Sequence, residues 1–268
     1  METPAQVTES ARQNVLLEAL PANDWNRIRT GLQPVTLALG EVIYESGAAL
    51  DYIYFPTTAI VSLLYVLADG GSAEIAVVGN DGVVGVALFM GGGSTPSRAV
   101  VQSEGMAYRL RAQLLKDEFA RGGEMQHVLL RYTQALITQM SQTAVCNRHH
   151  SIDQQLCRWL LLTLDRLASA SISMTQELIA NMLGVRREGV TEAAGNLQTA
   201  GLIRYTRGHI AVLDRAGIEA RCCECYAVVK RETDRLFPPR GAPAPKAAFA
   251  PPANDSGGVR VTGARATF

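Results

Sequence analysis

The chain has 268 residues, with 25 Lys and Arg balancing 25 Asp and Glu, and its 47% hydrophobic content is that of a globular protein long enough for two domains. No apolar run approaches the length of a membrane helix, and the N-terminal METPAQVTESARQ lacks a signal peptide's apolar core, so we expect neither a membrane span nor a secreted protein. Charge is uneven: residues 1–120 carry 7 basic against 13 acidic side chains, whereas residues 121–268 carry 18 against 12, so a polyanionic partner is expected to meet the second half.

The segment from Val35 to Leu110 is predicted to be all-β. Stretches rich in Val, Ile and Tyr alternate with turn sequences such as Asp69-Gly70-Gly71 and Asn80-Asp81-Gly82. This alternation is typical of a β-sandwich or barrel. A short helix over Leu16–Thr30 is predicted to precede it.

A long helix is predicted from Glu124 to Arg148, where the sequence contains no Gly or Pro. Its predicted face consists of Val128, Tyr132, Ala135, Leu136, Gln139 and Thr143. Because this face mixes apolar and polar residues, two interpretations stay open: a helix packed on its own β domain, or the seam of a homodimer, which we favour. A charge at Leu136 would then break the seam.

The helices that follow carry recognisable start and stop residues. Ser151 to Gln154 has the spacing of a capping box and opens the helix SIDQQLCRWLLLTLDRLA. SMTQELIANML has Ser173 or Thr175 as its N-cap and ends at Gly184, and a second helix begins after only two further residues. Two helices joined by a tight glycine turn are typical of a helix-turn-helix, and LIRYTRGHIAVLD after them predicts a β-hairpin, or wing, turning at Arg207-Gly208.

The second helix begins with residues that do not favour a helix start. Arg186 and Arg187 lie at the positive end of the helix dipole, and Gly189 follows in the same turn. These residues suit DNA instead, because Arg187 can bind a guanine edge and Glu188 can accept from a cytosine amino group. We expect Gly189 to let the backbone approach a phosphate. A merely solvated helix face is the alternative, and the capped helix, turn and wing argue against it.

TQELIANMLGVRREGVTEAAGNLQTAGLI, together with the wing and the glycine-rich β segment, resembles the Crp/Fnr family of bacterial transcription regulators over about residues 15–236, most strongly over 173–213. The resemblance implies an α+β protein of two domains: a cyclic-nucleotide-binding-like β-roll of jelly-roll type in 1–120, a dimerisation helix in 121–150, and a winged helix-turn-helix in 151–237. Residues 238–268 form a Pro/Ala/Gly-rich tail that we expect to be disordered.

The resemblance also implies which residues meet DNA. Base reading falls to Arg187, Glu188, Thr191 and Glu192, and phosphate contacts fall to Thr175, Gln176, Arg186, Arg207 and His209. Glu192 stands where the family usually has arginine, which puts the outer base of each half-site in doubt. The implied partners are double-stranded DNA with a palindromic operator, a second copy of the chain and RNA polymerase.

The sensor end fits the family less well. Cyclic AMP-binding members carry a Gly-Glu pair for the ribose and an Arg-Ser pair for the cyclic phosphate, whereas this chain offers Gly85-Val86 and Ser97-Arg98. Valine cannot accept a ribose hydrogen bond, although Arg98 could hold an anion from a shifted position. We therefore expect a degenerate effector pocket that does not bind cyclic AMP; a cyclic-nucleotide-responsive regulator is the alternative.

The five cysteines, all in the second half, are not a disulfide framework, and a reducing cytoplasm is the expected compartment. No cysteine precedes Cys146, so the N-terminal iron–sulfur cluster of the oxygen-sensing branch is not expected. Cys222, Cys223 and Cys225 lie in GIEARCCECYAVVKRETDRL, which we interpret as one helix with buried cysteines. His149-His150 is interpreted as a hinge or phosphate-facing pair. We expect no metal or cofactor; a metal- or redox-responsive regulator stays an alternative.

An enzyme is the competing class, since metal-dependent cupins share a β-roll architecture. Such an enzyme needs histidines on its strands, and residues 1–120 contain none, so we expect no catalytic residues. A cyclic-nucleotide effector protein that does not bind DNA is a further alternative, and Arg187-Glu188 argues against it. Neither the effector nor the target genes, nor the choice between activation and repression, follows from the sequence.

Overall fold

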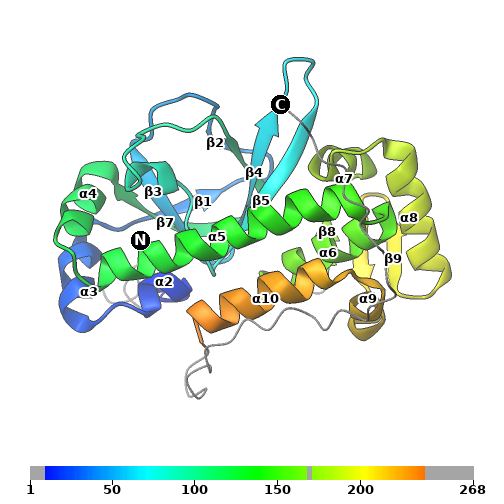
Figure 1. The fold of residues 1–268 in the computed structure, drawn as a ribbon. Helices are drawn as coiled ribbons and strands as arrows, with labels where there is room; N and C mark the ends of the chain where they lie inside the picture. Colours follow the sequence, from blue (N-terminus) through cyan, green and yellow to red (C-terminus); the bar gives the residue numbers. More distant parts are fainter. Residues whose placement is uncertain (1–9, 168–170, 239–268) are drawn as a thin grey trace, which may run out of the picture.

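Seven strands in the first half of the chain form two antiparallel sheets that face each other as a β-roll (Figure 1). The computed structural model describes residues 10–167 and 171–238. The strands are β1 Gln33–Leu37, β2 Val42–Tyr44, β3 Tyr52–Pro56, β4 Ile60–Val66, β5 Ser72–Val78, β6 Arg98–Ser103 and β7 Gly105–Arg111. The strand orders are β1-β7-β3 and β2-β6-β4-β5, which confirms the predicted all-β segment.

Alternation along the strands builds the core between the sheets. In β3, Ile53 and Phe55 are fully buried, while the neighbouring Tyr52 and Tyr54 are half-buried. The predicted turn at residues 80–82 also packs closely against the long helix that follows the β-roll. A Cβ at Gly82 would lie 2.6 Å from the ring of Tyr132, so the turn can pass under the long helix only as glycine.

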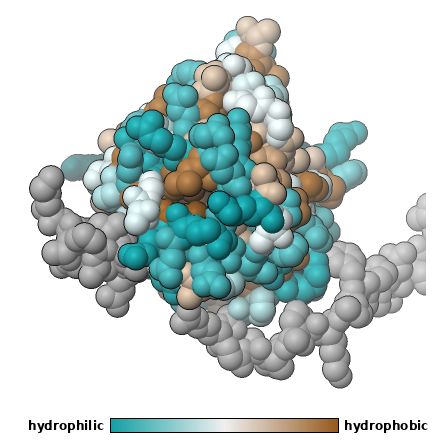
Figure 2. All heavy atoms as spheres, turned by 90° about the vertical axis from the view of Figure 1, so that its left-hand side faces the viewer, coloured by the Kyte–Doolittle hydropathy of each residue, from teal (hydrophilic) through white to brown (hydrophobic). Residues whose placement is uncertain are grey.

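Short helices cap one end of the β-roll: α2 Val15–Glu18, α3 Ala22–Ile28, the 3-10 turns η1 Arg29–Gly31 and η2 Val86–Leu88, and α4 Ala112–Ala120. The single helix predicted over Leu16–Thr30 is therefore wrong. Pro21 is the N-cap of α3, and a proline cannot donate the hydrogen bond that would continue α2. Figure 2 shows this end of the molecule as largely hydrophilic, with a small hydrophobic area near its centre.

The long helix α5 runs from Glu124 to His149 across the whole molecule (Figure 1). The face predicted as a dimer seam packs on the chain's own β-roll instead. Val128, Tyr132 and Leu136 are 0%, 6% and 5% exposed and belong to the β-roll core. The opposite side of α5 carries exposed apolar residues, namely Leu130, Ile137 and Val145. Since Leu136 lies in the core, its replacement by a charge would unfold the β-roll rather than report on a dimer.

The C-terminal domain contains the predicted capped helix, helix-turn-helix and wing in the predicted order, together with the strand β8 (Ser171–Ser173), which the sequence did not predict. Its elements are α6 Ile152–Leu164, β8, α7 Gln176–Leu183, α8 Arg187–Thr199, β9 Ile203–Thr206, β10 His209–Val212, α9 Arg215–Arg221 and α10 Glu224–Leu236. The capping box at Ser151 and Gln154 is present. Residues 155–164 of α6 are all buried, because the helix lies between α8 and the β-roll and shares one core cluster with Ile60, Leu64 and Val77.

The segment predicted as one cysteine-containing helix is two helices. Cys222 and Cys223 have ψ angles of 152° and 165°, so the chain is extended between α9 and α10. The last helix, α10, then runs back along α5 in the opposite direction: Glu232 accepts a hydrogen bond from Gln134, and the ring of Phe237 lies 5.8 Å from the Arg131 guanidinium. The predicted disordered tail falls, beyond Pro238, outside the described residues. In the described part of the chain, no helix combines the length and apolarity needed to cross a membrane.

Candidate DNA interface and effector pocket

Helix α8 has one buried and one exposed face. Val190, Ala193, Ala194 and Leu197 are at most 4% exposed and pack on the domain core. Arg187, Glu188, Thr191 and Glu192 occupy the opposite, exposed face of the first two turns. The residues predicted to read bases therefore share one accessible surface.

The turn before α8 is built as the sequence predicts. Thr175 is the N-cap of α7, where its hydroxyl accepts from the Leu178 amide, and Ser173 lies in β8 instead. Gly184 ends α7 with a φ of 66°, a left-handed conformation that only glycine adopts without strain. A Cβ there would also lie 3.2 Å from Cβ of Ala73 on β5, so the turn packs against the β-roll.

A polar recess of about 260 Å³ lies where α7, α8 and the wing meet. It is lined by Thr175, Gln176, Arg187, Tyr205, Arg207 and Gly208. Four of the predicted DNA-contacting residues thus converge on one concave site, and two of them are arginines. Within the described residues, Arg186, Arg187 and Arg207 form no ion pair, so their positive charge is available to an anion.

Tyr205 is a member of this recess that the sequence did not single out. Its hydroxyl donates to the carbonyl oxygen of Met174 at 2.8 Å, which ties β9 to the start of α7. Burial raises the pKa of the Tyr205 phenol, and the charge of Arg187 acts against that rise. Tyr205 and Arg187 therefore line the same recess from the wing and from α8.

The wing turns through Arg207 and Gly208, whose φ angles are 50° and 82°. Two positive φ values at the centre of a two-residue hairpin define the turn type that matches the twist of the strands. Among the described residues, Arg207 alone of the non-glycine residues has a positive φ. Holding an arginine there costs about 1–2 kcal/mol relative to an ordinary backbone conformation, so the sequence keeps this side chain at the wing tip against a local cost.

Gly189 lies close to a side chain of α6. A Cβ at this position would lie 2.5 Å from Cδ1 of Ile152, because α6 passes directly behind the first turn of α8. Glycine therefore leaves room for the side chain of Ile152 at this contact between α6 and α8. The approach of the Gly189 backbone to a phosphate stays a prediction.

The other predicted contact residues surround the recess. Arg186 is the exposed N-cap of α8, and the Thr191 hydroxyl donates to Oε1 of Gln176 at 2.8 Å, which links the two helices. His209 lies on β10, outside the lining of the recess, with Nδ1 3.0 Å from the hydroxyl of Ser173.

The predicted effector pocket is a small cavity between the β-roll and α5. Its volume is about 80 Å³, and its lining consists of Tyr44, Leu63, Tyr65, Ile75, Val83, Gly85, Val86, Ala87, Thr95, Ser97, Leu136 and Met140. Gly85, Val86 and Ser97 are therefore placed as predicted. Among the described residues, the lining contains hydroxyl groups but no charged side chain, and the volume lies well below the roughly 300 Å³ at which typical ligand sites begin.

Arg98 does not join this cavity. Its Nε lies 3.1 Å from Oε2 of Glu45, and its side chain is 35% exposed. The residue therefore pairs with a carboxylate outside the lining of the cavity.

Polar contacts fasten the β-roll to the DNA-binding domain. Arg166, which follows α6, forms an ion pair of 2.6 Å with Asp81, and Gln102 on β6 donates to the Thr163 hydroxyl at 3.1 Å. Buried Glu74 joins this network through Ser62, with 2.5 Å between Oγ and Oε2. Burial raises the pKa of Glu74 to about 7, while Ser62, Arg158 and Arg166 act in the opposite direction.

Comparisons with known proteins match both halves of the chain. Residues 34–121 match the family model of the cyclic nucleotide-binding domain, and residues 154–221 match that of the Crp-like helix-turn-helix domain. A sequence search of curated proteins found no match.

Solved structures share the fold. A regulator of the crp/fnr family from Eubacterium rectale superposes with a TM-score of 0.62 at 16% identity, over 77% of this chain and 96% of that one. FixK2 from Bradyrhizobium japonicum gives 0.60 at 18% identity, over 72% and 98%. The c-di-GMP responsive regulator CLP from Xanthomonas campestris gives 0.57 at 13% identity, over 72% and 99%. With both domains matched in this order and joined by α5, the chain belongs to the Crp/Fnr family of transcription regulators.

Proposed function

We propose that this regulator binds DNA as a homodimer on a palindromic site, with the start of α8 in the major groove. The observation that carries the proposal is the recess in which Arg187 and Arg207, neither of them in an ion pair with another described residue, meet the N-cap of α7. Arginines serve both phosphates and guanine edges, and a helix N-terminus adds its own positive potential. RNA polymerase as a partner stays a prediction.

The exposed side of α5 supports the homodimer. Leu130, Ile137 and Val145 are 48%, 55% and 45% exposed, and their spacings of seven and eight residues keep them on one side of the helix. Exposed apolar residues at such spacing gain free energy when a second copy of the helix covers them. A two-fold dimer would place its two α8 helices on half-sites about one DNA turn apart.

The effector domain is proposed not to bind cyclic AMP. A cyclic phosphate is bound most strongly by a cation, and the described lining of the cavity beside Gly85 and Val86 offers hydroxyl groups but no charged side chain. Leu136 and Met140 of α5 line this cavity, so a small uncharged ligand there would act directly on the dimer helix.

Selection of binding sites from random DNA tests the function. We expect the wild-type chain to select a palindrome, and Arg187→Ala to lose about 1–3 kcal/mol of binding free energy together with the preference for one guanine per half-site. Arg29→Ala, which removes an exposed arginine from the β-roll, is the matched control and should leave both unchanged. An unchanged base preference in Arg187→Ala would remove this residue from the base-reading role.

A further inference from the structure

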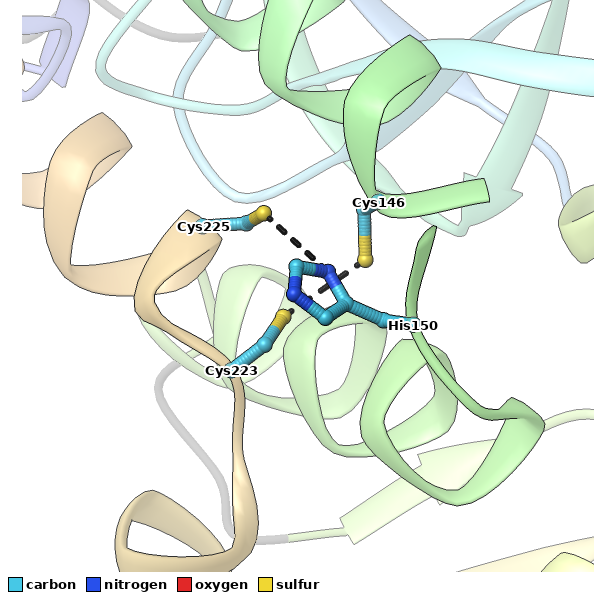
Figure 3. Close-up of side chains that lie close together, drawn as sticks. All are labelled: Cys146, His150, Cys223 and Cys225. Carbon is cyan, nitrogen blue, oxygen red and sulfur yellow. Dashed lines mark hydrogen bonds between the residues drawn. The ribbon is translucent and has the colours of Figure 1, made fainter. Parts of the chain in front are cut away.

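Four side chains of ligand type, from separate segments, meet where α5 ends and α10 begins. Cys146 lies on the last turn of α5, His150 follows that helix, and Cys223 and Cys225 flank the start of α10. One ligand atom from each, three sulfurs and one imidazole nitrogen, all lie within 4.8 Å of one another. Figure 3 shows the four side chains pointing toward one another from the two helix ends.

The separations suit a single tetrahedral ion. The sulfurs of Cys146 and Cys223 are 3.6 Å apart, and Sγ of Cys225 is 3.5 Å from Nδ1 of His150. Zinc binds sulfur at about 2.3 Å and imidazole nitrogen at about 2.0–2.1 Å, so tetrahedral ligands lie about 3.8 Å apart for two sulfurs and about 3.6 Å for sulfur and nitrogen. The space fits one ion rather than an iron–sulfur cluster, whose core places several atoms between its ligands.

The backbone is arranged so that all four side chains reach this point. Cys146 and His150 are four residues apart, which puts them on one side of α5. In an uninterrupted helix, positions 223 and 225 would point about 200° apart. The extended backbone at Cys222 and Cys223 removes that divergence. Cys223 also occupies the N-cap of α10, a position that Ser, Thr, Asp or Asn usually fill.

The surroundings suit a metal–thiolate centre. Cys146 and Cys225 are fully buried, Cys223 is 5% exposed, and cysteines packed only as small hydrophobes do not need an imidazole among them. Nε2 of His150 faces Oε2 of Glu224 at 3.4 Å, which is the carboxylate contact that orients a metal-binding histidine.

Positive charge is available as well. Three thiolates and one divalent ion leave a net charge of −1. Buried Arg158 donates to Thr143, one helical turn before Cys146, and the N-terminus of α10 adds its dipole.

We propose that Cys146, His150, Cys223 and Cys225 bind one zinc ion, which fastens the start of α10 to the end of α5. Three thiolates with one imidazole are a common donor set of structural zinc. His150 lies in the short connection between α5 and the DNA-binding domain, so the ion also fixes that connection. Such an ion stabilises the folded chain whether or not the chain binds DNA as proposed.

Elemental analysis of the full-length chain, purified under reducing conditions and reconstituted with zinc, tests the site. We expect about one zinc per chain, lost in Cys146→Ser and in Cys225→Ser. Cys222→Ser is the matched control, because this cysteine adjoins Cys223 but is not among the four clustered ligands, and it should retain the zinc. Cobalt in place of zinc should give the intense visible bands of tetrahedral cobalt–thiolate centres.

Chelation of the wild-type protein guards against variants that simply fail to fold. Removing the ion should lower the melting temperature, and adding zinc back should restore it, because an ion that binds the folded state stabilises it. A wild-type chain that takes up neither zinc nor cobalt overturns the proposal. So does zinc retained equally in both ligand variants, or a Cys146–Cys223 disulfide in a zinc-free protein that is stable to chelator.

Discussion

Glu74 makes the stability of this protein depend on pH in a direction opposite to that of most carboxylates. The side chain is 8% exposed and lies between the β-roll and the DNA-binding domain, where burial raises its pKa from 4.5 to about 7. The unfolded chain releases the proton near pH 4.5, whereas the folded chain keeps it until about pH 7. Raising the pH through this window therefore favours the unfolded state, and stability present at pH 4.5 is progressively lost by pH 7.

The size of the effect follows from the shift. At 1.36 kcal/mol per pKa unit, the full shift corresponds to about 3 kcal/mol, of which about 2.5 kcal/mol falls between pH 5 and pH 8. Glu74→Gln keeps the shape of the side chain but cannot ionise. We expect the variant to gain about 2–3 kcal/mol relative to wild type as the pH rises from 5 to 8.

Urea denaturation at several pH values measures this difference. Glu104→Gln, which changes an exposed carboxylate on the same domain, is the control and should follow the wild-type profile. Stability curves of wild type and Glu74→Gln that run parallel from pH 5 to 8 would refute the reasoning, because they would mean that Glu74 ionises alike in both states.

Three further predictions concern the dimer face of α5, the wing and the effector cavity. Ile137→Glu should give a folded monomer in sedimentation with weakened DNA binding. Leu136→Glu should instead lose the folded circular dichroism spectrum, because it buries a charge in the β-roll core. An intact dimer for Ile137→Glu would place the interface elsewhere. Arg207→Gly should raise the free energy of unfolding by about 1 kcal/mol, because it removes the backbone strain of an arginine in the left-handed conformation. The same variant should bind all DNA sequences more weakly and with a smaller salt dependence. Unchanged DNA affinity would exclude a phosphate contact by Arg207. Cyclic AMP should give no binding heat at micromolar concentration in calorimetry; a micromolar dissociation constant abolished by Arg98→Ala would show that this residue does hold the phosphate.

Capping and turn residues predicted the helix-turn-helix well, because neighbouring residues in the sequence determine where its helices begin and end. Gly184, Thr175 and the capping box at Ser151 act within one helical turn, and all three are placed as expected. The exposed arginines of α8 were also predicted, because charged residues at a helix start are unfavourable unless something outside the helix requires them. Tyr205 was missed, since only the folded wing brings it to Arg187.

Predictions that depended on distant contacts fared worse. The mixed stripe on α5 could pack on the β-roll or on a second chain, and periodicity does not distinguish these partners; buried Val128 and Tyr132 decide for the β-roll. Gly189 has no side chain whose contacts could be predicted, and only the folded structure places Ile152 next to it. In both cases the sequence identified an unusual face or residue but not the surface that it meets.

The break between α9 and α10 also depends on contacts that are distant in the sequence, and it bears on the proposed zinc site. The segment from residue 218 to 236 contains no Gly or Pro, so local preference favours one continuous helix there. Interrupting it at Cys222 and Cys223 gives up backbone hydrogen bonds, a loss that tertiary interactions must offset. Packing of Ile218 fixes α9 and packing of Val229 fixes α10, but neither requires a cysteine at the break. Coordination of one ion by Cys223 and Cys225, with Cys146 on α5 and His150 directly after it, accounts for both the break and the residues found at it.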